Sequence, residues 1–438
     1  KKIYAVILNT RANHIKGEKE MLLSQKTSVK LTENAANFIG HMCYAAYKLW
    51  NVCNYERYHY KELNLKEYPD WYYQKKAWKD SLWFKQLPSQ TAQEVCKLLD
   101  KSWKSFYALK KSGGIENPNP PRFKRANIPV TYMQNGIVHQ KGTEKVRLSL
   151  AKKLKEYMGT AYDIHENFLF LENKIFKGMD VIKQIKIYPP EKGRCRVIVI
   201  YEMPDAEVLP DNGRYLSIDP GVHNLLTCFD AANGKSFIVG RKYLSFCHRY
   251  YKEIARVQSQ WYSQQVRRGM RYRKSSRHIK KLYEKKKNVI RDYLHKITRY
   301  VVEYCKREKI HTVIMGDLKN IRKEKRLGNI TNQKLHELPF DKIKQMLSYK
   351  LKKEGICFIL QNEAYTSQCS PVSPEVKKEY GQKENRKKRG LYREVDKIYN
   401  ADAVGAYNIL RKYLKISGIE KELSLTGIER TWIIKVAV

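Results

Sequence analysis

Two acidic segments far apart in the chain constrain its fold most strongly. The first, Ser217–Gly221, ends an apolar stretch typical of a buried strand and delivers Asp219 into a Pro-Gly turn. The second, Asn400–Asn408, places Asp402 at the start of a helix rich in small residues, which can pack closely on a sheet. Asp219 alone would be explained equally well as a structural turn residue. Together, carboxylates at the ends of a strand and a helix favour a site for two divalent cations over a phosphodiester.

Such a site usually needs a third carboxylate, and the strand that should carry it reads Val313-Ile314-Met315-Gly316-Asp317. Glycine offers no ligand. Successive side chains of a strand point to opposite faces, so Asp317 is expected to point away from the site. What replaces the missing acid therefore decides whether the protein cuts nucleic acid or only binds it.

The charge of the chain points to a polyanionic partner. Its 438 residues include 86 Lys and Arg against 44 Asp and Glu, a formal net charge of +42. An excess of this size opposes compaction unless a polyanion neutralises it, which favours nucleic acid. The charge is spread along the whole chain, and no apolar run is long enough to span a bilayer, so a membrane role is not expected. Nine scattered cysteines and the lack of a signal-peptide pattern indicate a reducing cytoplasm.

The pattern of residues predicts a multidomain α+β protein. Residues 1–35 resemble a short strand followed by basic coil, and residues 122–210 favour strands, so these two parts are expected to form a small β-barrel. Residues 36–121 are helical and rich in aromatic residues, and form an inserted bundle. Residues 211–438 show three antiparallel strands and then helices alternating with strands, the order of an α/β ribonuclease H-like domain.

Local residue patterns also predict the individual strands and helices. Strands are predicted at 137–138, 146–148, 168–171, 182–187, 196–201, 215–218, 225–229, 237–239, 311–315 and 357–360, and helices at 241–266, 276–306, 341–353 and 401–415.

Four motifs together resemble one family. They are Asp219-Pro-Gly, Asn400-Ala-Asp-Ala-Val-Gly-Ala-Tyr-Asn-Ile-Leu, Glu363-Ala-Tyr-Thr-Ser-Gln and Leu87-Pro-Ser-Gln-Thr-Ala-Gln. The chain resembles TnpB, the transposon-encoded RNA-guided nucleases related to type V CRISPR effectors. Over nearly the whole chain, the resemblance implies a wedge β-barrel, a recognition bundle and a RuvC-like nuclease domain. It also implies a guide RNA from the transposon end, target DNA, two Mg²⁺ ions and a place in the prokaryotic cytoplasm with the nucleoid.

The chain departs from this family at the second acid. The family has a glutamate directly before an Asp-Leu pair, where this sequence has Gly316. A subset of related proteins carries glycine or proline there and supplies a glutamate from a later strand, and Glu363 matches that relocated position. We therefore predict Asp219, Glu363 and Asp402 as catalytic and metal-binding residues. Asp317 as the replacement, or no replacement at all, are the alternatives.

A second departure concerns zinc. The family usually carries two Cys-x-x-Cys pairs before the last acid, but this chain has only Cys369 between Glu363 and Asp402. Tetrahedral zinc needs four ligands. We expect a degenerate, zinc-free insert for target nucleic acid at about 367–398.

Basic residues crowd a predicted helical hairpin and are expected to contact phosphates: Arg267, Arg268, Arg271, Arg273, Lys274 and Arg277. A solvated helix face is the usual explanation for such runs, but few acids compensate them here. Gln90 and Gln93 could reach base edges, because amide side chains suit adenine. A role on the helix surface is equally open for both.

The leading hypothesis is an RNA-guided DNA endonuclease that cuts target DNA next to a short adjacent motif. A nuclease-dead, RNA-guided DNA-binding repressor is the alternative, with Gly316 as its best support. A transposase that joins DNA ends itself is a weaker third option. The oligomeric state is left open, with a monomer as one option.

Overall fold

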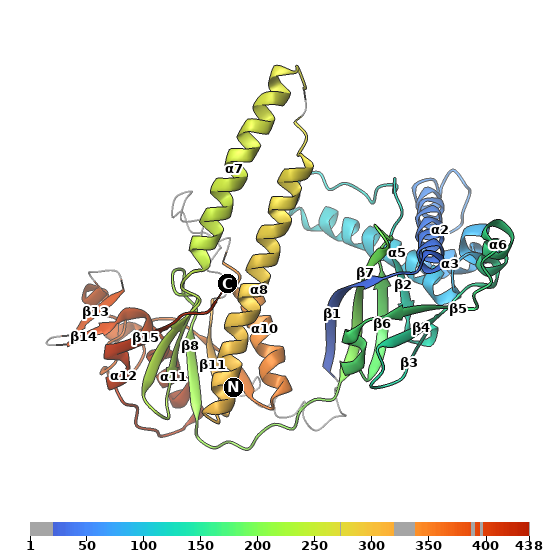
Figure 1. The fold of residues 1–438 in the computed structure, drawn as a ribbon. Helices are drawn as coiled ribbons and strands as arrows, with labels where there is room; N and C mark the ends of the chain where they lie inside the picture. Colours follow the sequence, from blue (N-terminus) through green and yellow to red (C-terminus); the bar gives the residue numbers. More distant parts are fainter. Residues whose placement is uncertain (1–20, 272, 319–337, 387–389, 395–396, 438) are drawn as a thin grey trace. The chain divides into compact units, whose positions relative to one another are not determined.

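The computed structural model describes residues 21–271, 273–318, 338–386, 390–394 and 397–437. The chain forms two compact units, Lys1–Asp205 and Ala206–Val438 (Figure 1). Both contain helices and sheets, so the α+β class that the sequence predicts is confirmed.

The first unit combines two antiparallel sheets with helices. Its strands are β1 (Met21–Lys30), β2 (Val130–Met133), β3 (Ile137–His139), β4 (Lys145–Ser149), β5 (Phe168–Glu172), β6 (Val181–Ile187) and β7 (Arg194–Met203). Its helices are α2 (Glu33–Tyr58), α3 (Trp71–Ala77), α4 (Leu82–Lys85), α5 (Ser89–Ser112) and α6 (Lys152–Tyr162), with short 3-10 turns η1 (Gln134–Gly136) and η2 (Lys174–Gly178). One sheet has the order β1-β7-β6-β2, and the other has the order β3-β4-β5.

The predicted barrel is not observed, because neither sheet closes on itself among the described strands of this unit. No strand pairing joins the edge strands β1 and β2 among the described residues, and helices α2 and α5 share one hydrophobic core with both sheets. The expected basic coil is also wrong from Met21 to Lys30, where β1 pairs antiparallel with β7 along its whole length. The short strand predicted before it lies outside the described residues.

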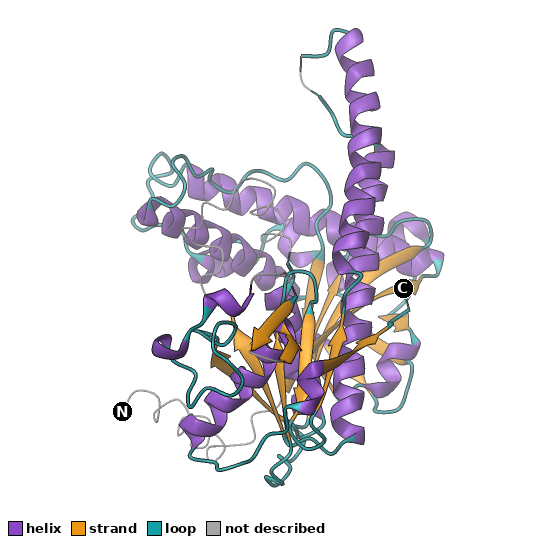
Figure 2. Ribbon diagram, turned by 90° about the vertical axis from the view of Figure 1, so that its left-hand side faces the viewer, coloured by secondary structure: helices purple, strands orange, loops and turns teal. Residues whose placement is uncertain are grey.

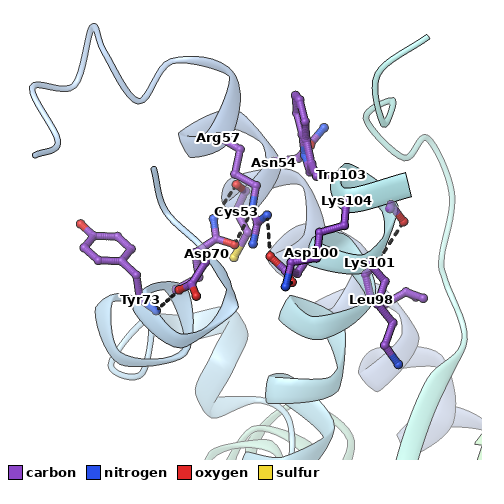
Figure 3. A network of polar contacts seen from close by, with 12 residues as sticks. Cys53, Asn54, Arg57, Asp70, Tyr73, Leu98, Asp100, Lys101, Trp103 and Lys104 are labelled. Carbon is purple, nitrogen blue, oxygen red and sulfur yellow. Dashed lines mark hydrogen bonds and ion pairs between the residues drawn. The ribbon is translucent and has the colours of Figure 1, made fainter. Parts of the chain in front are cut away.

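Buried polar contacts join the helices of the first unit. The Arg57 guanidinium of α2 pairs with Asp100 of α5 at 3.0 Å, and both side chains are almost fully buried (Figure 3). Arg57 Nε also donates to the Gln74 amide oxygen of α3 at 2.9 Å. Because an unpaired buried charge is costly, these contacts fix how the three helices pack.

The second unit is built on one mixed sheet. Its strands are β8 (Tyr215–Asp219), β9 (Leu226–Asp230), β10 (Lys235–Val239), β11 (Thr312–Asp317), β12 (Cys357–Asn362) and β15 (Arg430–Ile434), in the order β12-β11-β8-β9-β10-β15. A separate hairpin pairs β13 (Leu391–Glu394) with β14 (Lys397–Asn400). The helices are α7 (Tyr243–Arg267), α8 (Arg277–Arg307), α10 (Phe340–Lys353), α11 (Ala401–Ser417) and α12 (Thr426–Glu429), with 3-10 turns η3 (Lys378–Tyr380) and η4 (Lys383–Arg386).

Helices cover both faces of the central strands. Leu216 and Ile218 of β8 share a core with α8 and α10, whereas Tyr215 of the same strand packs with α11. Strand β11 alternates in the same way, with Val313 and Met315 in the first core and Ile314 in the second. Odd positions of β8 and even positions of β11 therefore face α11. That parity sets the orientation of the acidic residues at the strand ends.

Helices α7 and α8 form a long hairpin (Figure 1). Figure 2 shows from the side that it extends beyond the sheet of its own unit. In the part of the chain that the structure describes, no helix combines the length and the apolar character that crossing a membrane requires.

Candidate active site

Asp219 and Asp402 approach each other where β8 ends and α11 begins. Asp219 is the last residue of β8 and shares the parity of Tyr215, so its side chain faces α11. A Cβ on Gly405 of α11 would lie only 2.5 Å from Asp219 Oδ2, so any larger residue there would displace the carboxylate. The Ser217 hydroxyl donates to the Ala406 carbonyl at 2.7 Å and joins strand to helix. The small residues of α11 thus permit the close approach that the sequence predicts.

The carboxylate of Asp402 lies in the first turn of α11 and has two polar neighbours. The N-cap residue Asn400 accepts hydrogen bonds from the Asp402 and Ala403 amides at 3.1 Å, which starts the helix at this point. Asn224 Nδ2 donates to Asp402 Oδ2 at 2.7 Å, and Arg386 of η4 lies 3.4 Å from Oδ1.

Glu363 reaches this site across strand β11. The strand β12 that precedes it was expected to neighbour β8, but β11 lies between the two. Met315 of β11 is in register with Ile218, so the next positions, Gly316 and Asp219, end side by side. A Cβ on Gly316 would overlap the Glu363 carboxylate. The glycine that removes one acid therefore leaves the space that another acid fills.

A hydrogen-bonded turn holds Glu363 in this position. The Asn362 side chain accepts from the Ala364 amide at 2.7 Å, and the Thr366 hydroxyl donates to the Glu363 carbonyl at 2.9 Å. Asn408 of α11 donates to the Thr366 carbonyl at 2.9 Å and ties the turn to the helix that carries Asp402. Tyr365 has a φ of +68°, a strained value for a bulky residue.

Burial, and then crowded negative charge, raise the pKa of two of these carboxyls. Burial, and then the charge of Asp402, raise the pKa of Asp219 to about 7, while Arg386 opposes the shift. Burial, and then the charge of Asp219, raise the pKa of Glu363 to about 8. Glu363 Oε1 is buried without a hydrogen-bond partner among the described residues. The carboxylates therefore interact electrostatically in a poorly solvated site.

In this conformation, no group of three or more His, Cys, Asp or Glu side chains from the described residues is arranged so that it could hold a metal ion. Cys369 is buried, and its thiol lies 3.1 Å from the Lys377 carbonyl. The insert at about 367–398 that surrounds it includes residues 387–389 and 395–396, which lie outside the described residues.

Asp317 lies on the other face of the sheet from Gly316. Its side chain points to the same face of β11 as those of Val313 and Met315. Lys344 Nζ of α10 lies 3.6 Å from its carboxylate. The alternation of side chains along β11 thus directs Asp317 towards α10, as its one-residue offset predicts. Its charge still makes the smallest contribution to the raised pKa of Glu363.

All six basic residues predicted to contact phosphates lie at the end of the α7–α8 hairpin and are exposed: Arg267, Arg268, Arg271, Arg273, Lys274 and Arg277. The backbone of this connection is held by Gln265, whose amide donates to the Lys274 carbonyl at 2.8 Å and accepts from the Lys274 amide at 2.7 Å. Trp261 donates to the same carbonyl at 2.7 Å. These hydrogen bonds hold the backbone of the connection in place. We call its six exposed basic residues the cationic tip.

Gln90 lies in the first turn of α5, and Gln93 follows three residues later. Gln93 donates to the Ser89 hydroxyl at 3.3 Å, and Gln90 Oε1 is buried without a hydrogen-bond partner in the described part of the chain. Neither contact tests a role in reading bases, which stays a prediction.

Asn224 and Arg386 were not among the site residues predicted from the sequence. Asn224 belongs to the turn after Asp219, and its carbonyl accepts from the Gly221 amide at 3.1 Å, which brings the asparagine back beside the strand end. A polar residue in a tight turn after a predicted catalytic strand is a usable signal. Arg386 comes from the insert and carries no such signal.

The chain is similar in sequence and fold to RNA-guided nucleases. The family model described as "Probable transposase" (OrfB_IS605) matches residues 198–322, and the model described as "Cas12f1-like, TNB domain" matches residues 340–409. A relative from Escherichia coli (strain K12), named "Putative RNA-guided DNA endonuclease InsQ", is 25% identical over 349 residues, which cover 76% of this chain and 77% of that protein.

A solved structure, the cryo-EM structure of a Cas12f1-sgRNA-target DNA complex, has a similar fold with a TM-score of 0.54. It is 14% identical, and the match covers 86% of this chain and 83% of that one. The predicted resemblance to TnpB and type V effectors is thereby confirmed.

Proposed function

We propose that the chain is an RNA-guided DNA endonuclease of the TnpB type, which cleaves target DNA next to a short adjacent motif. Asp219, Glu363 and Asp402 are its catalytic carboxylates. The observation that carries this proposal is the Glu363 carboxylate in the space above Gly316, beside the end of β8. The similarity to a named RNA-guided endonuclease over three quarters of both chains supports the guided reaction.

The three carboxylates suit hard divalent cations by the type of their donor atoms, although this conformation does not gather them into a group that could hold a metal ion. Mg²⁺ prefers oxygen ligands, and carboxylate oxygens are what this site offers. The buried Glu363 Oε1 lacks a partner, and the pKa of Asp219 and of Glu363 is raised partly by neighbouring negative charge, so a cation would relieve both conditions. When bound, two Mg²⁺ ions supply Lewis acidity that activates water and stabilises the leaving oxygen.

The chain's own residues position these groups. Asn224 orients the Asp402 carboxylate through its hydrogen bond to Oδ2. The turn after β12 is held by Thr366 and Asn408, so Glu363 is fixed relative to α11. Arg386 lies 3.4 Å from Asp402 and can meet the negative charge of a phosphodiester at this edge. Positioned groups of this kind lower the barrier because little rearrangement is left for the reaction.

The proposed partners are a guide RNA from the transposon end and target DNA. The net charge of +42 and the cationic tip of the α7–α8 hairpin suit a polyanion. We assign guide and target recognition to the wedge region (1–35 and 122–210) and the helical recognition region (36–121), and cleavage to the RuvC-like region (211–438). The insert at about 367–398 would contact the target without zinc, and the protein would act in the prokaryotic cytoplasm with the nucleoid.

A cleavage assay with matched variants tests the proposal. Wild type, Glu363→Gln and Asp317→Asn would each be purified with RNA transcribed from the flanking end of the locus, and mixed with Mg²⁺ and a target plasmid carrying randomised flanks. We expect Glu363→Gln to cut about a thousandfold more slowly, since loss of a metal ligand costs several kcal/mol of transition-state stabilisation. Asp317→Asn should cut at nearly the wild-type rate.

Both variants should bind target DNA as the wild type does, which separates the chemistry from binding. Loss of cutting in Asp317→Asn with an active Glu363→Gln would contradict the assignment of the acids. Wild-type protein that binds the target and never cuts it would support the repressor instead. Strand-transfer products without RNA would point to a transposase.

A further inference from the structure

Strand β5 breaks the alternation of apolar and polar residues expected of a sheet with one solvent face. Its sequence is Phe-Leu-Phe-Leu-Glu, and Leu169 and Leu171 are fully buried in the core of the first unit. Phe168 and Phe170 therefore point outward and remain 39% and 45% exposed. Polar residues are expected at such positions, so two adjacent outward phenylalanines call for a function.

The strand beside them supplies positive charge. On β4, the Arg147 guanidinium lies 4.3 Å from the centre of the Phe168 ring, and Lys145 Nζ lies 4.6 Å from the centre of the Phe170 ring. Val138 of β3, Arg147 and Phe170 form one register row across the three strands. Glu172, opposite Lys145, adds an acidic side chain to this face. We call Val138, Lys145, Arg147, Phe168 and Phe170 the phenylalanine platform.

We propose that the phenylalanine platform binds unpaired nucleotides of RNA. Arg147 and Lys145 each lie over one ring, and the exposed remainder of each ring is apolar surface on which a base can stack. The two cations can then meet the phosphates between those bases. Stacked aromatic side chains flanked by cations are the chemistry that holds single-stranded nucleic acid. Phe168 and Phe170 are two residues apart on the same face of β5, so the two rings would stack against two successive bases.

RNA fits the platform better than DNA does. Duplex DNA hides the faces of its bases, whereas folded RNA exposes unpaired bases in loops, bulges and ends. A protein partner is disfavoured because both rings are already flanked by cations. That the RNA is the guide itself rests on the proposed function; the capacity to stack unpaired RNA does not.

The test compares full-length variants in binding to a fluorescent oligo-uridine RNA. Phe168→Thr with Phe170→Thr removes both rings but keeps residues that favour strands. We expect the RNA affinity to fall about tenfold or more for each ring lost. Phe168→Tyr with Phe170→Tyr should bind like the wild type, because it retains the rings. Leu22→Thr is the matched control, since Leu22 is also an outward strand residue, 60% exposed on β1.

Photocrosslinking locates the contact directly. RNA carrying 5-iodouridine should crosslink to the peptide that contains Phe168 and Phe170, and mass spectrometry would identify it. Unchanged RNA affinity in the threonine variant, or a crosslink elsewhere only, would overturn the inference. An equal loss of affinity for oligo-deoxythymidine would overturn the assignment to RNA, and blunt duplex DNA should bind all variants alike.

The inference and the proposed function can fail separately. If the wild type does not cut DNA but the rings are needed for RNA binding, the platform stands and the endonuclease does not. If the wild type cuts DNA with its guide and the threonine variant binds RNA unchanged, the platform fails and the endonuclease stands.

Discussion

Replacing Gly316 with alanine would place a methyl group in the space that the Glu363 carboxylate occupies. Gly316 is a buried strand residue without a positive φ, so its backbone accepts alanine and the collision is the main effect. The substitution thus tests whether Glu363 lies where the site requires it. It does so without removing any carboxylate.

The size of the effect follows from the geometry. The new Cβ would lie 2.5 Å from Glu363 Cδ and 2.6 Å from Cγ, whereas carbon atoms in contact are about 3.5–4.0 Å apart. The end of the side chain must therefore move by roughly 1 Å, and overpacking of this kind costs about 1–3 kcal/mol of stability. A displacement of roughly 1 Å at a catalytic group slows a reaction about a hundredfold.

Two measurements on one set of variants check this reasoning. Target cleavage with guide and Mg²⁺ should fall about a hundredfold in Gly316→Ala while target binding is retained. Unfolding by denaturant, without Mg²⁺, should show the destabilisation. In Glu363→Ala the same glycine substitution should cost almost nothing, because the carboxylate is gone. This non-additivity is the signature of direct contact.

The matched control is Gly178→Ala, since a Cβ at Gly178 would meet nothing within 4 Å. It should neither slow cleavage nor lower stability measurably. Gly316→Ala with wild-type cleavage and stability would refute the placement of Glu363. Equal destabilisation by Gly316→Ala in the presence and absence of the Glu363 carboxylate would refute it as well.

Three further predictions concern charge and hydrogen bonding. Because the pKa of Glu363 is raised to about 8 from 4.5 in the folded chain, wild-type protein without Mg²⁺ should lose stability as pH rises between those values. Glu363→Gln should show a shallower slope, because the raised pKa of Asp219 still contributes to it, and should be more stable by roughly 3 kcal/mol at neutral pH, measured by denaturation across pH. Asn224→Ala removes the hydrogen bond to Asp402, so cleavage should slow about tenfold with target binding unchanged; an unaltered rate would exclude a positioning role. Asp100→Ala leaves the buried Arg57 unpaired and should cost about 3–5 kcal/mol, visible as a lower melting temperature.

Most elements of the second unit could be predicted from sequence because their signals are local. Strands such as Tyr215–Asp219 are continuous apolar runs, and the small residues of Asn400–Asn408 mark a helix in close contact with a sheet. β15 (Arg430–Ile434) was missed, since its place is set by parallel pairing with β10, about two hundred residues earlier. β1 was missed for a similar reason: its ladder with β7 gives it order that its own polar sequence does not.

The site residues also divide into those with a local sequence signal and those placed by long-range contacts. Asp219 and Asp402 follow from motifs whose residue types carry their chemistry. Glu363 was predicted only through a family resemblance, because nothing local shows that the end of β12 reaches across β11 to β8. Arg386 is brought to Asp402 by tertiary structure alone. The expected barrel failed because closure depends on pairing between distant edge strands, which short apolar runs do not encode.

For Glu363 to reach from the end of β12 across β11, the β11 residue in its path must have no side chain, and Gly316 meets that condition. An acidic side chain at position 316 or at position 363 would therefore occupy the same space, and acids at both positions would collide. If Glu363 acts as we propose, a survey that examines only the position of Gly316 would overlook the acid supplied from the other position. The informative question is whether either member of the pair carries the charge.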